Sequence, residues 1–393
     1  MRFLPGLLAL GLFLSNPAVA EEECVEFAGQ CQKRDDTSLT VRLDGDTPNL
    51  SGIEALEWVT WVNVRGDGRA VDLTPLSTLK GLEKLSLERV EVESLSPLVG
   101  LPLRHLALKE LGATDLAPLG GMTELRDVFL SRVQVAPLNL AVLPPLERLS
   151  LIETPVAGLE GLVGWQDLRQ LALAHTGVSD LSPLSGMTLN SLFLRGARLT
   201  DLSGLSGVKG LTHLTLNGAE VTSLDGAPFG PGFRRLSAEG SALTDISALS
   251  AAVNLEGLNL RGSMVSDLTA ISGMQRLKQL DLRETPLTDL SPLIDLPALK
   301  QLDLSDTQIA DLSPLAGLVS VQQISLSRIP ATDLSPLANM DAVQGLWLNE
   351  TRATDLTPLM EMDSLEAMRI DDARMVTKGG LPDYIATRIP PGE

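Results

Sequence analysis

The chain is poor in the residue types that usually build catalytic and metal sites. Its 393 residues include two cysteines, three histidines and one tyrosine, and aromatic residues make up 3%. His105, His175 and His213 fall in different units of the repeat described below, too far apart for a shared metal or a catalytic triad. No glycine-rich phosphate loop follows a strand signal, and no C-x-x-C motif occurs. The sequence therefore predicts no enzyme and no cofactor.

Cations are also scarce, since 31 Lys and Arg stand against 50 Asp and Glu, a formal net charge of −19. Nucleic acids and anionic membranes attract clustered cations, so we expect neither as a partner. Beyond the N-terminus no apolar run approaches the roughly 20 residues of a membrane helix, which predicts no membrane insertion of the mature chain. Ten of the acids recur in one repeat slot and so belong to the architecture: Asp72, Asp115, Asp180, Asp201, Asp245, Asp267, Asp289, Asp311, Asp333 and Asp355.

Residues 1–20 have the pattern of a secretory signal peptide. Arg2 precedes a short apolar run, and Ala18-Val19-Ala20 forms a small-residue cleavage site. The mature protein is therefore expected to be secreted or periplasmic. Cys24 and Cys31 follow closely, and an even number of cysteines in an exported chain predicts a disulfide, here in an N-terminal cap over residues 21–38. Two free thiols are the alternative.

The rest of the chain repeats one pattern, L-x-x-L-x-L followed by T-D-L-S-P-L, with a period of 21 to 23 residues. Such a period predicts a solenoid in which each unit buries its leucines only by stacking on its neighbours. We expect about 15–16 repeats over residues 39–370, and a C-terminal cap and tail over 371–393. Predicted strand leucines or their equivalents fall at Val64, Leu87, Leu108, Leu130, Leu151, Leu173, Leu194, Leu216, Ala238, Leu260, Leu282, Leu304, Leu326, Leu348 and Ile370.

One repeat shows how a coil forms. Leu302 and Leu304 are two residues apart, so a strand places both on its inner side and Asp303 on the outer side. Ser-Pro in D-L-S-P-L starts a one-turn 3₁₀ helix, and the preceding Asp311 is expected to accept a backbone N–H. The sequence thus predicts an α/β solenoid, a right-handed coil with one long parallel sheet on the concave face and short 3₁₀ turns on the convex face.

These motifs resemble those of the internalin-type bacterial leucine-rich-repeat proteins of the 22-residue class, over roughly residues 39–370. The resemblance implies an exported, monomeric, non-enzymatic scaffold that binds a protein or peptide through its concave sheet, in adhesion or in host or envelope interaction. A periplasmic inhibitor or assembly factor of an envelope enzyme is the alternative. The chain departs from the family where an asparagine usually follows the strand. That slot holds Thr307, Val90 or Ala197 here, so the loop hydrogen bonds should differ.

Candidate binding residues stand in outward columns of the predicted sheet, where three aromatic side chains interrupt a run of small and polar ones. An exposed apolar patch with small residues at its floor can receive a partner side chain. Scattered surface aromatics without a function are the alternative. The predicted patch and a separate aromatic further along the sheet consist of Phe129, Ile152, Ala172, Ala174, His175 and Phe193, and of Trp347.

A weak calcium candidate also lies in this sheet. Asp281 and Asp303 should stand side by side with Asp306 nearby, and like charges so placed repel one another unless they are neutralised. Ion pairs with Arg261 and Arg283 are the favoured explanation, so we predict no metal site.

One repeat loses the pattern over residues 225–238. The stretch is rich in glycine and proline, and Ala238 replaces a strand leucine, yet the repeat length is kept. We expect the coil to hold its register and to bulge on the convex side.

Overall fold

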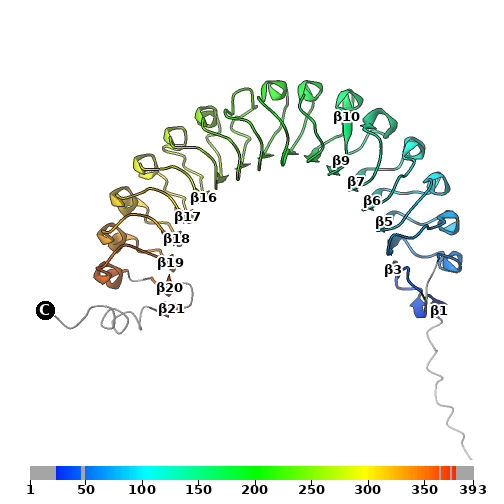
Figure 1. The fold of residues 1–393 in the computed structure, drawn as a ribbon, viewed down its shortest axis with the longest axis horizontal. Helices are drawn as coiled ribbons and strands as arrows, with labels where there is room; N and C mark the ends of the chain where they lie inside the picture. The colour runs from blue at the N-terminus through cyan, green and yellow to red at the C-terminus, as the bar shows by residue number, and fades with distance from the viewer. Residues whose placement is uncertain (1–23, 46–48, 363, 372–373, 378–393) are drawn as a thin grey trace, which may run out of the picture.

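The computed structural model describes residues 24–45, 49–362, 364–371 and 374–377. Figure 1 shows a curved arch in which every coil adds one strand to the inner face and one turn to the outer face. The predicted signal peptide, residues 1–20, and most of the predicted tail, 371–393, lie outside the described residues.

The inner face is a single sheet with 16 parallel strands, and its last strand pairs antiparallel with β21. Its register follows the repeat, so Asp281 stands opposite Asp303, and Ser325 stands opposite Trp347. The predicted long parallel sheet is therefore confirmed. The longer strands are β3 (Ser38–Arg42), β4 (Trp61–Arg65), β5 (Lys84–Glu88), β6 (His105–Lys109), β7 (Asp127–Ser131), β9 (Arg148–Ile152), β11 (Gln170–Ala174), β20 (Ala367–Asp371) and β21 (Arg374–Thr377). The shorter ones are β12 (Ser191–Phe193), β13 (His213–Thr215), β14 (Arg235–Ser237), β15 (Gly257–Asn259), β16 (Gln279–Asp281), β17 (Gln301–Asp303), β18 (Gln323–Ser325) and β19 (Gly345–Trp347).

The outer face carries one-turn 3₁₀ helices, as predicted. Each of the ten aspartates in the shared slot accepts the backbone N–H of the residue two positions on, as Asp289 does from Ser291 at 2.9 Å. The acidic repeat slot is thus a structural cap. The helices are η1 (Ile53–Ala55), η2 (Thr74–Thr78), η3 (Ser96–Leu98), η4 (Ala117–Gly121), η5 (Leu140–Val142), η6 (Glu160–Leu162), η7 (Ser182–Leu184), η8 (Ser203–Leu205), η9 (Ser247–Ala251), η10 (Thr269–Ile271), η11 (Ser291–Leu293), η12 (Ser313–Gly317), η13 (Ser335–Asn339) and η14 (Thr357–Glu361).

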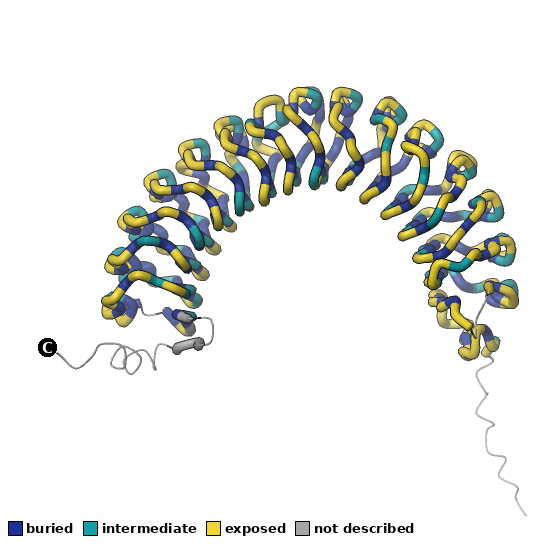
Figure 2. Tube along the Cα trace, in the orientation of Figure 1, coloured by how far each residue is buried: buried dark blue, intermediate teal, exposed yellow. Residues whose placement is uncertain are grey.

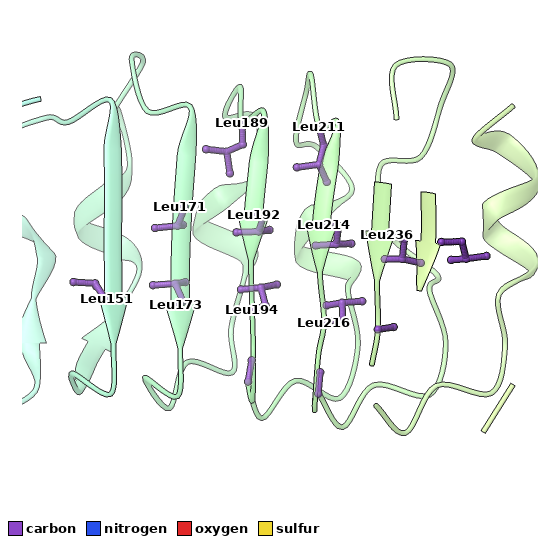
Figure 3. Close-up of a cluster of buried hydrophobic side chains, with 14 of the residues drawn as sticks. Leu151, Leu171, Leu173, Leu189, Leu192, Leu194, Leu211, Leu214, Leu216 and Leu236 are labelled. Atoms are coloured by element: carbon purple, nitrogen blue, oxygen red, sulfur yellow. The ribbon is translucent and has the colours of Figure 1, made fainter. Parts of the chain in front are cut away.

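Leucines from every coil form one continuous core between the two faces. Figure 3 shows the strand leucines in stacked rows, with Leu192 and Leu194 beside Leu214 and Leu216. All four are at most 1% exposed. Figure 2 shows the buried residues along the inside of each coil and exposed ones around it. Because each coil shares its core only with its neighbours, stability depends on stacking.

The first coil is covered by a hairpin of β1 (Cys24–Phe27) and β2 (Gln30–Lys33). The disulfide between Cys24 and Cys31 closes it. Phe27 is 5% exposed and belongs to the core. The indole N–H of Trp58 donates to the carbonyl of Lys33 at 3.0 Å. The hairpin thus closes the open apolar end of the solenoid.

The irregular repeat keeps its register, lacks the 3₁₀ helix of its neighbours, and has a phenylalanine in the slot that holds Leu211 and Leu255 in the adjacent coils. β14 pairs with β13 and β15 as its neighbours do, while no 3₁₀ helix lies between β13 and β14, a stretch that the structure describes in full. Phe233 is completely buried, and its ring meets that of Phe229 edge to face at 4.7 Å. Ala238 is fully buried in the strand-leucine row. A second irregular stretch adds a small parallel pair, β8 (Leu138–Asn139) with β10 (Val156–Gly158).

The position where the family usually has an asparagine makes its hydrogen bond to the preceding strand in two ways. Thr307 donates its hydroxyl to the carbonyl of Leu304 at 2.7 Å. Ala197 instead uses its backbone N–H, which donates to the carbonyl of Leu194 at 3.2 Å. Ser263 is completely buried, and its hydroxyl has no hydrogen-bond partner.

Candidate functional site

A hollow of the inner face lies over β12 to β19 and has a volume of about 620 Å³. Phe193 lines one end and Trp347 the other, and both side chains are half-buried. We call this hollow the groove. The sequence suggested these two aromatics as separate candidates, and the sheet joins them in one surface.

Phe129 lines a different hollow, of about 250 Å³, on the N-terminal side. Three strand steps separate it from Phe193, as the repeat predicts. The ammonium group of Lys109 lies 5.5 Å from its ring centroid. Ala172 pairs with Phe193, and Ile152 pairs with Ala174. The predicted patch is therefore continuous along the sheet, but its two phenylalanines line separate hollows.

His175 lies beyond the end of β11, at the rim of the sheet. Its φ of +53° is left-handed, and its imidazole lies over Gly196, where a Cβ would come within 2.2 Å of the ring. A side chain in this position belongs to the rim rather than to the sheet floor.

A flat indole forms the C-terminal end of the groove. A Cβ added to Gly345 would meet the ring of Trp347 at 3.0 Å, so the indole lies over the glycine backbone of its own strand. Glycine inside a strand often marks the close approach of another group. The absence of a side chain at Gly345 therefore lets the indole of Trp347 lie across the sheet.

A glutamine ladder crosses the floor of the groove. Nε2 of Gln279 donates to Oε1 of Gln301 at 2.8 Å, and Nε2 of Gln301 donates to Oε1 of Gln323 at 3.2 Å. The ladder thus has a direction. Among the described residues, Oε1 of Gln279, beside Gly257, and Nε2 of Gln323, whose strand position is opposite Gly345, have no hydrogen-bond partner.

One guanidinium group contacts both acids of the floor and offsets one of their two negative charges. Arg283 contacts Asp281 at 2.5 Å and Asp303 at 3.4 Å. Burial raises the pKa of Asp303, although hydrogen bonds from Ser305 oppose the shift. Hydrogen bonds to Asp281 raise the pKa of Arg283, so its guanidinium group stays protonated.

The remaining acid of the calcium candidate is also held by an arginine. Arg328 contacts Asp306 at 2.6 Å and lowers the pKa of that carboxyl. Arg261, which the sequence groups with Arg283, instead contacts Glu284 at 2.7 Å and Glu239 at 3.8 Å. Over the described ranges, no three His, Cys, Asp or Glu side chains come together as a metal site.

A cationic end lies near Phe193. Arg235 and His213 line the groove there, and burial together with the charge of Arg235 lowers the pKa of His213. His213 is therefore neutral near pH 7. The neighbouring Arg234 lies 3.7 Å from Glu256, whereas no described carboxylate lies within 4 Å of Arg235.

The rim beside the groove differs from the rest of the arch. From β5 to β19, the residue two positions after each pair of strand leucines or their equivalents has a positive φ. It is charged in the N-terminal coils, where Arg132 contacts Glu153 at 2.9 Å and Glu110 at 3.2 Å. Beside β12 to β15 it is glycine in four successive coils: Gly196, Gly218, Gly240 and Gly262. This rim without side chains was not predicted from the sequence, although four glycines in one repeat slot indicate it.

Comparisons with known proteins agree on the fold. A family model described as leucine-rich repeats in two copies matches residues 275–317. A leucine-rich-repeat protein of Leptospira interrogans superimposes with a TM-score of 0.70 at 20% identity, covering 87% of this chain and 92% of that one. The internalin InlF of Listeria monocytogenes gives 0.59 at 19% identity, covering 88% and 91%. The plant peptide hormone receptor RGFR1 in complex with RGF2 gives 0.57 at 13% identity, covering 86% and 67%.

No curated protein matches the sequence. The repeat, the family model and the solved structures together confirm a leucine-rich-repeat solenoid fold. Within the described residues, no helix has the length and apolarity needed to span a membrane.

Proposed function

We propose that this chain is an exported, monomeric, non-enzymatic scaffold that binds a protein or peptide partner in the groove between Phe193 and Trp347. The observation that carries the proposal is the groove itself, a hollow across eight strands with an aromatic side chain at each end. Aromatic anchors in a partly buried surface are the residues that usually dominate binding energy. The plant receptor RGFR1, a protein of the same fold, forms a complex with RGF2.

Export is proposed from the signal-peptide pattern of residues 1–20 and from the disulfide between Cys24 and Cys31, which is typical of oxidising compartments. The proposed organisation is a signal peptide over 1–20, a cap over 21–38, the repeats over 39–370 and a tail over 371–393. Mass spectrometry of the protein recovered from the periplasm or medium should show a chain that begins at Glu21. A full-length chain retained in the cytoplasm would contradict export.

The binding proposal is tested by blocking the groove. Thr215 lies in its floor, one strand from Phe193. The mature protein with Thr215→Arg should lose a partner that the wild type captures from envelope or host-cell extracts. Val319→Arg changes a convex residue that is 59% exposed and should keep the partner. Retention by the first variant and loss by the second would place binding on the convex face and overturn the proposal.

A further inference from the structure

We infer that the groove holds one extended segment of the partner, with an acidic side chain on Arg235 and a large apolar side chain on Trp347, about six or eight residues apart so that both side chains face the sheet. The inference rests on the proposed function and names the kind of partner. It follows from the ladder polarity, the charge and the length of the groove.

The charge of the groove favours an acidic group at its Arg235 end. Arg283 is occupied by Asp281 and Asp303. Arg235 is exposed, lines the groove and has no carboxylate within 4 Å among the described residues. A guanidinium group recognises a carboxylate through paired hydrogen bonds. Arg283 offsets one of the two floor carboxylates, so the favourable place for an acidic side chain is Arg235, two strand steps away on β14.

The glutamine ladder offers hydrogen-bond partners to the backbone of the bound segment. An extended segment presents N–H and C=O groups that need partners once they are buried. Oε1 of Gln279 accepts at one end of the ladder, and Nε2 of Gln323 donates at the other. Gly257 lies between Arg235 and Gln279, and a Cβ there would come no closer than 3.6 Å to either side chain. The missing side chain opens the floor to a close backbone approach.

The length of the groove sets the spacing of the two anchors. Arg235 on β14 and Trp347 on β19 are five strand steps apart. At about 4.8 Å for each step, the separation is about 24 Å along the sheet. An extended chain advances about 3.3 to 3.6 Å for each residue, which corresponds to about seven residues, and a spacing of about six or eight keeps both side chains on one face.

The test selects peptides without assuming a sequence. A random twelve-residue library displayed on phage is panned against the mature wild-type protein, and the enriched peptides are synthesised. We expect an Asp or Glu and an aromatic or large aliphatic residue about six or eight positions apart. Calorimetry should show roughly tenfold weaker binding to Arg235→Gln and to Trp347→Ala. Moving the anchors three residues closer or further apart should weaken binding similarly.

Two matched controls separate this mode from general attraction. Arg234 is paired with Glu256, and Arg369 stands opposite Trp347 on β20, outside the groove lining. Arg234→Gln and Arg369→Gln should bind as the wild type does. Circular dichroism melting of each variant verifies that it is folded.

The inference is overturned if the selected peptides have no acidic residue, show no preferred spacing, or bind Arg235→Gln as tightly as the wild type. It also fails if they depend on Arg369. If a captured natural partner is sensitive to Thr215→Arg but is not displaced by the peptides, the groove binds a folded surface. The proposed function then stands without this inference.

Discussion

The coils of β4 to β11 and the coils of β12 to β19 have one backbone ladder and two different inner surfaces. The N–H of Arg132 donates to Ile152 O at 2.9 Å in the first set, and the N–H of Gly218 donates to Glu239 O at 2.8 Å in the second. The strands span five residues in the first set and three in the second. The shared repeat therefore builds the ladder, and residues that vary between coils decide what the ladder presents.

The difference begins at the slot after each strand. Val90 and Val133 are buried there in the N-terminal coils, beside a rim of charged residues. Ala197 and Ala219 occupy it in the central coils, where each donates its N–H to the carbonyl three residues back and closes a turn. Beside β12 to β15, a tight turn with a glycine rim leaves the edge of the groove bare. Charged rims with ion pairs lie on both sides of these four coils, as in Arg132 with Glu153 and Arg328 with Asp306. The open rim is therefore confined to the coils of β12 to β15.

The largest expected effect is at the irregular coil before β14, within the second set. Phe233→Ala removes a completely buried ring from the slot that holds Leu211 and Leu255 in the neighbouring coils, and should lower the free energy of unfolding by about 3–5 kcal/mol. Phe129→Ala, at a half-buried ring of the inner face, should cost less than about 1.5 kcal/mol. Urea unfolding followed by circular dichroism measures both. Equal losses would show that Phe233 is not a core residue in solution.

Removal of the cap disulfide should affect the N-terminal coils first. Cys24→Ser with Cys31→Ser opens a short loop, for which chain entropy predicts a loss of about 2–3 kcal/mol. Because stability in a solenoid passes only between neighbours, hydrogen exchange should accelerate in β3 and β4 before β19. Uniform acceleration along the sheet would indicate a single cooperative unit and contradict this expectation.

Two hydroxyls in the same slot should respond differently to the same substitution. Thr307→Ala removes a buried hydrogen bond to the carbonyl of Leu304 and should cost about 1–2 kcal/mol. Ser263→Ala removes a buried hydroxyl that has no partner, and should be neutral or slightly stabilising. Thermal melting of the two variants provides the comparison. A loss for Ser263→Ala equal to that for Thr307→Ala would mean that the Ser263 hydroxyl is bonded in solution.

The smallest expected effect is a loss of folding stability at low pH. Hydrogen bonds from Ser291 hold the pKa of Asp289 below its usual value, and Asp267 and Asp311 are lowered in the same way by Thr269 and Ser313. The folded state then binds fewer protons than the unfolded state near the unfolded pKa of about 4. The stabilisation is complete above that pH and is lost as the pH falls through the folded pKa values.

This acid sensitivity should be concentrated in the C-terminal half. Its caps are aspartates in every coil from Asp245 to Asp355, whereas the neutral Ser94 and Asn139 cap two N-terminal coils. Hydrogen exchange at pH 3 should therefore accelerate in β15 to β19 relative to β5 to β9. Asp289→Asn keeps the acceptor and should reduce the acid effect, while Asp289→Ala should destabilise at every pH. Equal acid sensitivity of both halves would contradict this expectation.

Much of the fold was predictable because a period near 22 residues imposes the same local geometry on every coil. The row of strand leucines, the Ser-Pro turns and the aspartate caps all follow from residues within one repeat. The site was predictable only in part. Phe193 and Trp347 were visible as aromatics in an outward column, but Arg235 and Gln279 resembled ordinary polar residues of a solvated sheet.

The sequence by itself determined the solenoid, because each coil forms from short-range signals and stacks only on its neighbours. Tertiary structure alone decided how distant coils combine. It placed Arg235 and Trp347 in one groove, gave the glutamine ladder its direction, and laid the indole over Gly345. These relations depend on side-chain orientations across several strands, and no repeat pattern specifies those orientations.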